Sequence, residues 1–121
     1  MIRGEAHMIE VEVTVNGQLM SRPRGDGLIV GTPTGSTAYL LSTGAPIVTP
    51  EVDCILVNPL NEYSFSSRPV IVPGTAEVTL SVITTRPTPV TASVDGRAPR
   101  TLVEPLTLTI ERAARPAKLI T

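Results

Sequence analysis

The chain has 121 residues, with ten basic and eleven acidic side chains and a formal net charge of −1. This length is enough for one domain with a modest core and short for two, so we expect a single domain over residues 1–121. The near-neutral charge excludes a strong electrostatic footprint for nucleic acid or an anionic membrane. With two tyrosines, one phenylalanine and no tryptophan, an aromatic platform for base stacking is also not expected.

Residues 9–15 alternate valine and isoleucine with glutamate and threonine. This period of two predicts a strand with one buried face. Asn16 and Gly17 follow, which is a strong hairpin signal, and residues 18–22 would return antiparallel to the first strand. Residues 28–30 form a short apolar strand that ends before Pro33, because proline has no N–H for a sheet ladder.

Further short strands alternate with turn signals along the rest of the chain. They are expected at residues 52–57, 68–72, 77–84, 90–94, 101–103, 106–110 and 118–120, with a polar loop at 59–67 and turns at 73–74 and 95–96. Such spacing predicts an all-β fold of two packed, mainly antiparallel sheets or a distorted sandwich. One short helix is expected over residues 36–43, capped by Ser36 or Thr37 and ending at Gly44.

The single cysteine, Cys54, lies in an apolar run. A disulfide within the chain is excluded, and a lone thiol packed in a core is typical of a cytoplasmic protein. The first 20 residues lack the apolar segment of a signal peptide, and no stretch approaches the roughly 20 apolar residues of a membrane span. We therefore expect a cytoplasmic protein with no membrane partner.

The densest functional signal is the stretch 25–46, GDGLIVGTPTGSTAYLLSTGAP. A strand leads into a loop with four hydroxyl side chains and then to a helix N-terminus, whose free N–H groups suit a polar or anionic ligand. The alternative is an ordinary strand–loop–helix connection without a ligand, although capping needs only one of those hydroxyls. Asp26 and Asp95 are either turn residues or carboxylates beside a ligand, and Arg68 is a structural cation or a phosphate contact.

Several enzyme classes lack their required residues. His7 is the only histidine and is expected to be exposed, so neither a Ser-His-Asp triad nor a transition-metal site is supported. The chain has no nucleophile-elbow motif, Walker-type loop or dinucleotide GxGxxG motif.

Residues 25–48, with TPTGSTAY at their centre, resemble the signature of the NAD kinase family in its C-terminal domain. The resemblance continues through the Arg-Pro pair within 66–69 and the Asp-Gly pair at 95–96, and covers nearly the whole chain. It implies transfer of a phosphoryl group from ATP or polyphosphate to the 2′-hydroxyl of the NAD adenosine, giving NADP. In that family an α/β N-terminal domain carries a catalytic Gly-Gly-Asp-Gly motif and handles Mg²⁺, and a β-rich C-terminal domain supplies much of the NAD pocket.

The resemblance also implies which residues contact NAD. Thr34, Thr37 and Ala38 would lie on the adenine side, Tyr39 would line the pocket, and Ser42 would contact ribose or adenine. Asp26 matches the family aspartate that contacts NAD, in oligomers sometimes across a subunit boundary. These six positions, Asp26, Thr34, Thr37, Ala38, Tyr39 and Ser42, are the predicted substrate site.

The 121 residues contain no Gly-Gly-Asp-Gly motif. We therefore expect the NAD-binding, oligomerising C-terminal domain of an NAD kinase, as a dimer or tetramer, with its catalytic N-terminal domain absent. It would hold no tightly bound cofactor and no catalytic or metal-binding residue, and would not phosphorylate NAD alone. One alternative is a non-catalytic β-domain that serves only self-association or partner binding. A more distant one is a lipid-kinase relative of the same general fold.

Overall fold

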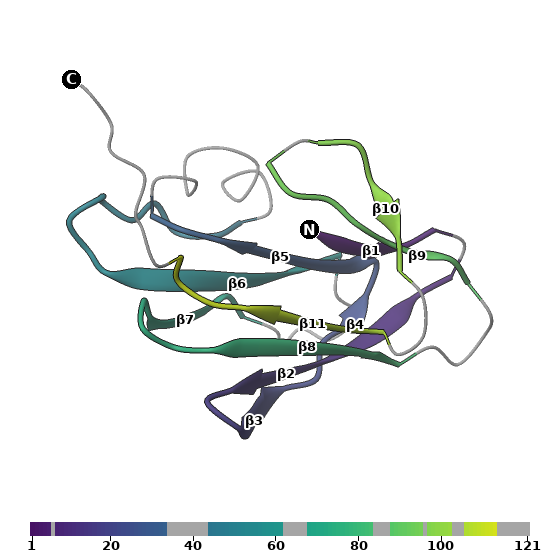
Figure 1. The fold of residues 1–121 in the computed structure, drawn as a ribbon, viewed down its shortest axis with the longest axis horizontal. Helices are drawn as coiled ribbons and strands as arrows, with labels where there is room; N and C mark the ends of the chain where they lie inside the picture. Colours follow the sequence, from purple (N-terminus) through teal and green to yellow (C-terminus); the bar gives the residue numbers. More distant parts are fainter. Residues whose placement is uncertain are drawn as a thin grey trace.

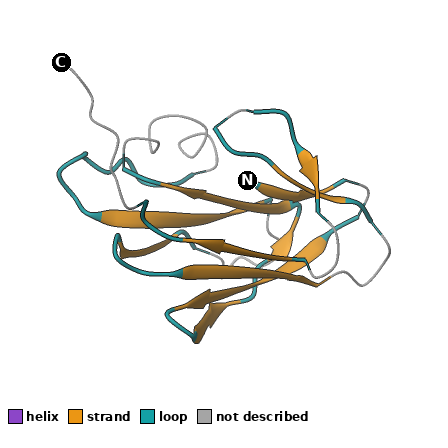
Figure 2. Ribbon diagram, in the orientation of Figure 1, coloured by secondary structure: helices purple, strands orange, loops and turns teal. Residues whose placement is uncertain are grey.

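The computed structural model describes residues 1–5, 7–33, 44–61, 68–83, 88–95, 97–102 and 106–113. Their strands form two antiparallel sheets (Figures 1 and 2), which confirms the all-β prediction. These ranges contain no helix, and hence none that could cross a membrane. The helix predicted over 36–43 and the strand predicted over 118–120 lie outside the described residues.

The two sheets differ in size and are both fully antiparallel. The larger sheet has the order β10 (Arg100–Thr101), β9 (Val90–Ala92), β1 (Ile2–Gly4), β5 (Gly27–Gly31), β6 (Cys54–Leu60) and β7 (Val70–Pro73). The smaller sheet has the order β11 (Thr107–Ile110), β8 (Val78–Ile83), β2 (Ile9–Val15) and β3 (Gln18–Ser21), and β4 (Arg24–Gly25) also pairs with β2.

The main core lies between the sheets. Alternate residues of β2 point into it, as the period of two predicts, and β8 contributes Val78 and Leu80. The larger sheet contributes Ile2, Leu28 and Val57 to this core, each at most 1% exposed. Contact between two apolar sheet faces excludes water from both and stabilises the pair.

The opposite face of β5 and β6 carries a second, smaller core. Its buried members are Ile29, Ala45, Cys54, Leu56 and Leu60. Burial on both faces explains why these two strands read as continuous apolar runs rather than alternating ones. The prediction that Cys54 packs in a core is confirmed, since it is 6% exposed and its thiol is free.

Several predicted boundaries were wrong. The strand predicted over 52–57 begins at Cys54, and Val52 before it is 48% exposed. The strand also continues through Pro59 and Leu60, which belong to the predicted polar loop. It does so because β5 begins at Gly27, and Gly27 pairs with Leu60. The strand predicted over 68–72 occupies residues 70–73.

The two predicted hairpin turns have different outcomes. Asn16 and Gly17 both have positive φ, 50° and 83°, and join β2 to β3 as predicted. Asp95 also has a positive φ of 50°, but β9 ends at Ala92 and pairs it with Arg100. The chain therefore connects β9 to β10 through residues 93–99, which is longer than the predicted tight hairpin.

The core between the sheets predicts a contrast between two leucines. Leu80 is 2% exposed and Leu19, on β3, is 53% exposed. Leu80→Ala should lower the free energy of unfolding by about 2–5 kcal/mol, because it leaves a cavity between the sheets. Leu19→Ala should change it by less than about 0.5 kcal/mol. Urea denaturation measures both, and equal losses would contradict this assignment of the core.

Candidate functional site

Asp26 lies between β4 and β5, and its main chain is held on two sides. Its N–H donates to the carbonyl oxygen of Leu60 at 3.0 Å, and its own carbonyl accepts from the N–H of Gly4 at 3.0 Å. These two bonds tie it to the end of β6 and to β1. The backbone of Asp26 is therefore fixed, and the residue as a whole is partly exposed.

Gly27 permits the close approach that holds Asp26 in place. A Cβ atom on Gly27 would lie 2.0 Å from the carbonyl oxygen of Ile2 and 2.9 Å from the Cα of Arg3. Both atoms belong to the β1 backbone, which has no side-chain freedom with which to move aside. A larger residue here would push β1 away from β5.

Asn61 contacts the Asp26 carboxylate, and the sequence analysis missed it. Its Nδ2 donates to Oδ2 of Asp26 at 2.8 Å. Asn61 directly follows β6 and has a φ of 47°, a conformation that asparagine tolerates better than most residues. The only sequence signal was an asparagine at the end of a buried strand, and the contact itself depends on the pairing of β5 with β6.

The hydroxyl-rich loop begins at the opposite end of β5. Thr32 and Pro33 directly follow this strand, whereas Asp26 directly precedes it. Thr32 comes six residues after Asp26, so an extended strand separates the two residues by roughly 20 Å at about 3.3 Å per residue. Thr34, Thr37, Ala38, Tyr39 and Ser42 lie outside the described residues, so the structure places only Asp26 of the six predicted contacts.

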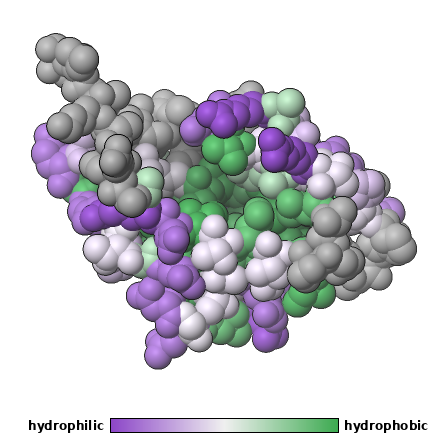
Figure 3. Space-filling view, in the orientation of Figure 1, coloured by the Kyte–Doolittle hydropathy of each residue, from purple (hydrophilic) through white to green (hydrophobic). Residues whose placement is uncertain are grey.

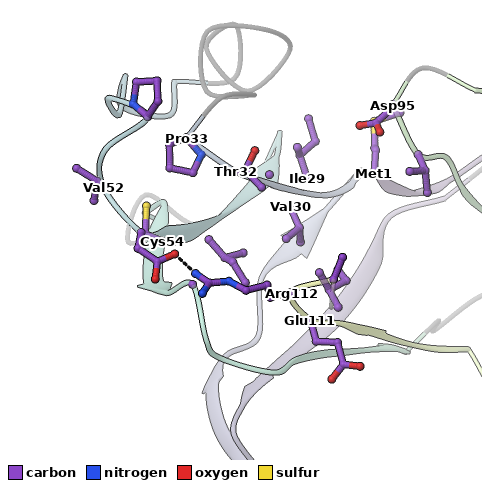
Figure 4. A pocket seen from close by; sticks show the side chains of 18 of the residues that line it. Met1, Ile29, Val30, Thr32, Pro33, Val52, Cys54, Asp95, Glu111 and Arg112 are labelled. Carbon is purple, nitrogen blue, oxygen red and sulfur yellow. Dashed lines mark hydrogen bonds and ion pairs between the residues drawn. The ribbon is translucent and has the colours of Figure 1, made fainter. Parts of the chain in front are cut away.

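A cavity of about 1010 Å³ lies beside Thr32 and Pro33. Figure 3 shows an apolar hollow with polar residues around it, and Figure 4 shows side chains that line the cavity. Side chains of both sheets line it. The apolar lining includes Met1, Ile29, Val30, Ile55, Val94 and Ile110, and the polar lining includes Thr32, Asp53, Asp95, Glu111 and Arg112. The loop of the family signature thus leaves β5 at the wall of a large cavity.

An ion pair links the two sheets at this cavity. Arg112, after β11, contacts the carboxylate of Asp53, before β6 (Figure 4). Gly74 leaves the room for it, because a Cβ there would meet the ends of both side chains. Both partners are substantially exposed, so the pair contributes little to stability and mainly defines the cavity border.

Two groups at the cavity have displaced pKa values. Burial lowers the pKa of the Met1 amino group, which donates to the carbonyl oxygen of Ser93 at 2.8 Å, and the Asp95 carboxylate partly offsets this. Hydrogen bonds from its own backbone N–H and from Thr49 lower the pKa of the exposed Glu51 carboxyl.

All 121 residues match the family described as "ATP-NAD kinase C-terminal domain". The chain belongs to this family. It is 45% identical over 96 residues to an NAD kinase of Legionella pneumophila (strain Corby), a match that covers 79% of this chain and 32% of the relative. The chain thus spans about a third of the length of the curated relatives that it matches.

Two solved structures of the family superpose on this NAD kinase domain. A yeast NADH kinase complexed with NADH gives a TM-score of 0.75 at 30% identity, covering 89% of this chain and 33% of that one. An NAD kinase from Archaeoglobus fulgidus in complex with ATP gives a TM-score of 0.81 at 30% identity. This match covers 96% of this chain and 45% of that one. The family predicted from TPTGSTAY is confirmed, and the alternative of a β-domain that serves only association is not favoured.

The remaining sequence candidates are placed as follows. His7 is exposed, as predicted, and its backbone N–H donates to Thr88 Oγ1 at 3.3 Å. Asp95 has a turn conformation and also lines the cavity. Both predicted roles, a turn residue and a carboxylate beside a ligand, therefore stay open. Arg68 is exposed. Within the described ranges, no three histidine, cysteine or acidic side chains group as metal ligands.

Two glycines test how the site is built. Gly27→Ala should lower the free energy of unfolding by about 2 kcal/mol or more, because the new Cβ meets the backbone of β1. Gly74→Ala should cost less than about 1 kcal/mol, since it meets only the movable ends of Asp53 and Arg112. Urea denaturation of both variants measures the difference, and a larger loss for Gly74→Ala would contradict it.

Proposed function

We propose that this domain binds NAD and supplies part of the substrate site of an NAD kinase, which phosphorylates the 2′-hydroxyl of the NAD adenosine to give NADP. The observation that carries this proposal is Asp26, whose backbone is hydrogen-bonded to β1 and to the end of β6 and which stands at the position that the family signature assigns to NAD. A carboxylate so placed accepts hydrogen bonds from ribose hydroxyls or an amide. The family match and the NADH and ATP complexes of the two solved relatives support it.

The other contacts come from the hydroxyl-rich loop. In our proposal Thr34, Thr37 and Ala38 contact the adenine side, Tyr39 lines the pocket, and Ser42 contacts ribose or adenine. Their support is the TPTGSTAY match and the position of Thr32 and Pro33, which carry the chain from β5 past the cavity.

We also propose that the site is shared between copies of the chain. Asp26 precedes β5 and the loop begins after it at Thr32, roughly 20 Å away. Two copies related by a twofold axis can bring the start of the loop in one copy toward Asp26 of the other. We therefore propose a dimer or tetramer.

We assign the catalytic base, the Mg²⁺ ion and the phosphoryl donor, ATP or polyphosphate, to the N-terminal domain that the family resemblance implies. The described residues do not form a group that fits Mg²⁺, so we derive no step through the ion here. The role of this domain is to hold and orient the nucleotide, which lowers the entropic cost of reaction. A cytoplasmic location is proposed from the reduced, buried Cys54 thiol.

Calorimetric titration with NAD tests the substrate proposal. The 121-residue chain should bind NAD, and Asp26→Ala and Thr37→Val should each weaken binding by at least about tenfold, because each removes a polar contact in the site. Glu10→Ala and Thr79→Val, on β2 and β8 of the other sheet, should leave the affinity unchanged. Unchanged affinity in Asp26→Ala would count against the assignment of Asp26, and no binding by the chain itself would refute the proposal.

Co-expression of Asp26→Ala with Thr37→Val tests the shared site. In a dimer with random pairing, about one quarter of all sites would combine an intact loop with an intact Asp26 from the other copy. Titration of the mixture should therefore recover about that fraction of tight NAD sites. If both groups acted within one copy, the mixture would show none.

A further inference from the structure

The contact between Asn61 and Asp26 has no role in the function proposed so far. Asn61 stands at the end of β6 and Asp26 at the start of β5, and antiparallel pairing of these strands brings the two residues together. The separation of Asn61 Nδ2 and Asp26 Oδ2 is 2.8 Å, the length of a good charge-assisted hydrogen bond. Asn61 is exposed, so burial does not demand this bond.

The bond restricts rotation of the Asp26 side chain. Hydrogen bonds to Leu60 and Gly4 hold its backbone, which leaves rotation of the carboxylate about its side-chain torsions. An ionised carboxylate only accepts hydrogen bonds, so Asn61 must present its NH₂ group and not its carbonyl. One carboxylate oxygen is thereby occupied. In the part of the chain that the structure describes, no hydrogen bond is made to the other oxygen, Oδ1.

We propose that Asn61 is a positioning residue that orients the Asp26 carboxylate toward the nucleotide. The inference rests on the proposed role of Asp26 in NAD binding. Asn61 holds Oδ2, and Oδ1 is presented to a hydroxyl or amide of the ligand. A carboxylate fixed before the ligand arrives loses less side-chain entropy on binding, which raises affinity.

A purely structural role for Asn61 makes a different prediction. Its φ of 47° matches that of Asn16, φ 50°, which is a turn residue whose Oδ1 accepts from the N–H of Glu77 at 2.9 Å. If Asn61 served only the turn, glycine or aspartate would replace it, because both tolerate this conformation. Asn16 is thus a matched control: same residue type, same backbone region, and a partner far from Asp26.

The test compares NAD titrations of Asn61→Gly and Asn61→Asp with the unchanged chain. Asn61→Gly keeps the backbone conformation and removes the amide, and should weaken NAD binding about 3- to 10-fold. Asn61→Asp places two carboxylates together, so at pH 8 their repulsion should weaken binding further. Between pH 8 and pH 5 this variant alone should regain affinity relative to the unchanged chain, because one shared proton restores the hydrogen bond.

Asn16→Gly and Asn16→Asp should bind NAD as the unchanged chain does at both pH values. In an Asp26→Ala background, Asn61→Gly should cause no further loss, because the amide then has no carboxylate to orient. If Asn61→Gly binds normally while Asp26→Ala does not, the role of Asn61 is overturned and the proposed function stands. If Asp26→Ala also binds normally, or the unchanged chain does not bind NAD, the assignment of Asp26 falls and this inference falls with it.

Discussion

The close passage of β1 along β5 is the constraint on which the described part of the site depends. Gly27 allows it, because any side chain there would collide with the carbonyl oxygen of Ile2. With β1 in place, the N–H of Gly4 donates to the carbonyl oxygen of Asp26. The N–H of Asp26 donates in turn to the carbonyl oxygen of Leu60. The two residues of the Asp-Gly pair therefore have different roles. Gly27 lets the backbones of β1 and β5 approach each other, and the backbone of Asp26 is fixed beside this contact.

The pairing of β5 with β6 organises the rest. These strands are buried on both faces, one toward the other sheet and one toward the smaller core that contains Cys54 and Leu56. Such a pair is rigid, because packed side chains hold it from both sides. Its two ends carry different groups: Asp26 with Asn61 at one, and Thr32 with the cavity at the other. In the proposed shared site, a second copy of the chain would bring together groups from the opposite ends of this strand pair.

Much of the fold followed from local patterns. Alternation over residues 9–15 predicted β2 and its buried face, and Asn16 with Gly17 predicted the hairpin. The errors arose where a strand end is decided by its partner: β6 continues through Pro59 and Leu60 because β5 lies alongside, and β10 pairs with β9 across a wider loop than the Asp-Gly signal suggested. Turn propensity is local, but register depends on neighbouring strands and on burial.

Local sequence patterns were enough to predict the family and the all-β class, because TPTGSTAY and the alternating strands are properties of adjacent residues. Only the tertiary structure decided that Asn61 meets Asp26 across two strands, that Asp53 and Arg112 join the sheets, and that Asp26 and the signature loop stand at opposite ends of β5. Each of these three placements depends on which strands pair and in which register. Strand pairing joins positions that are distant in the sequence, so no local pattern encodes it.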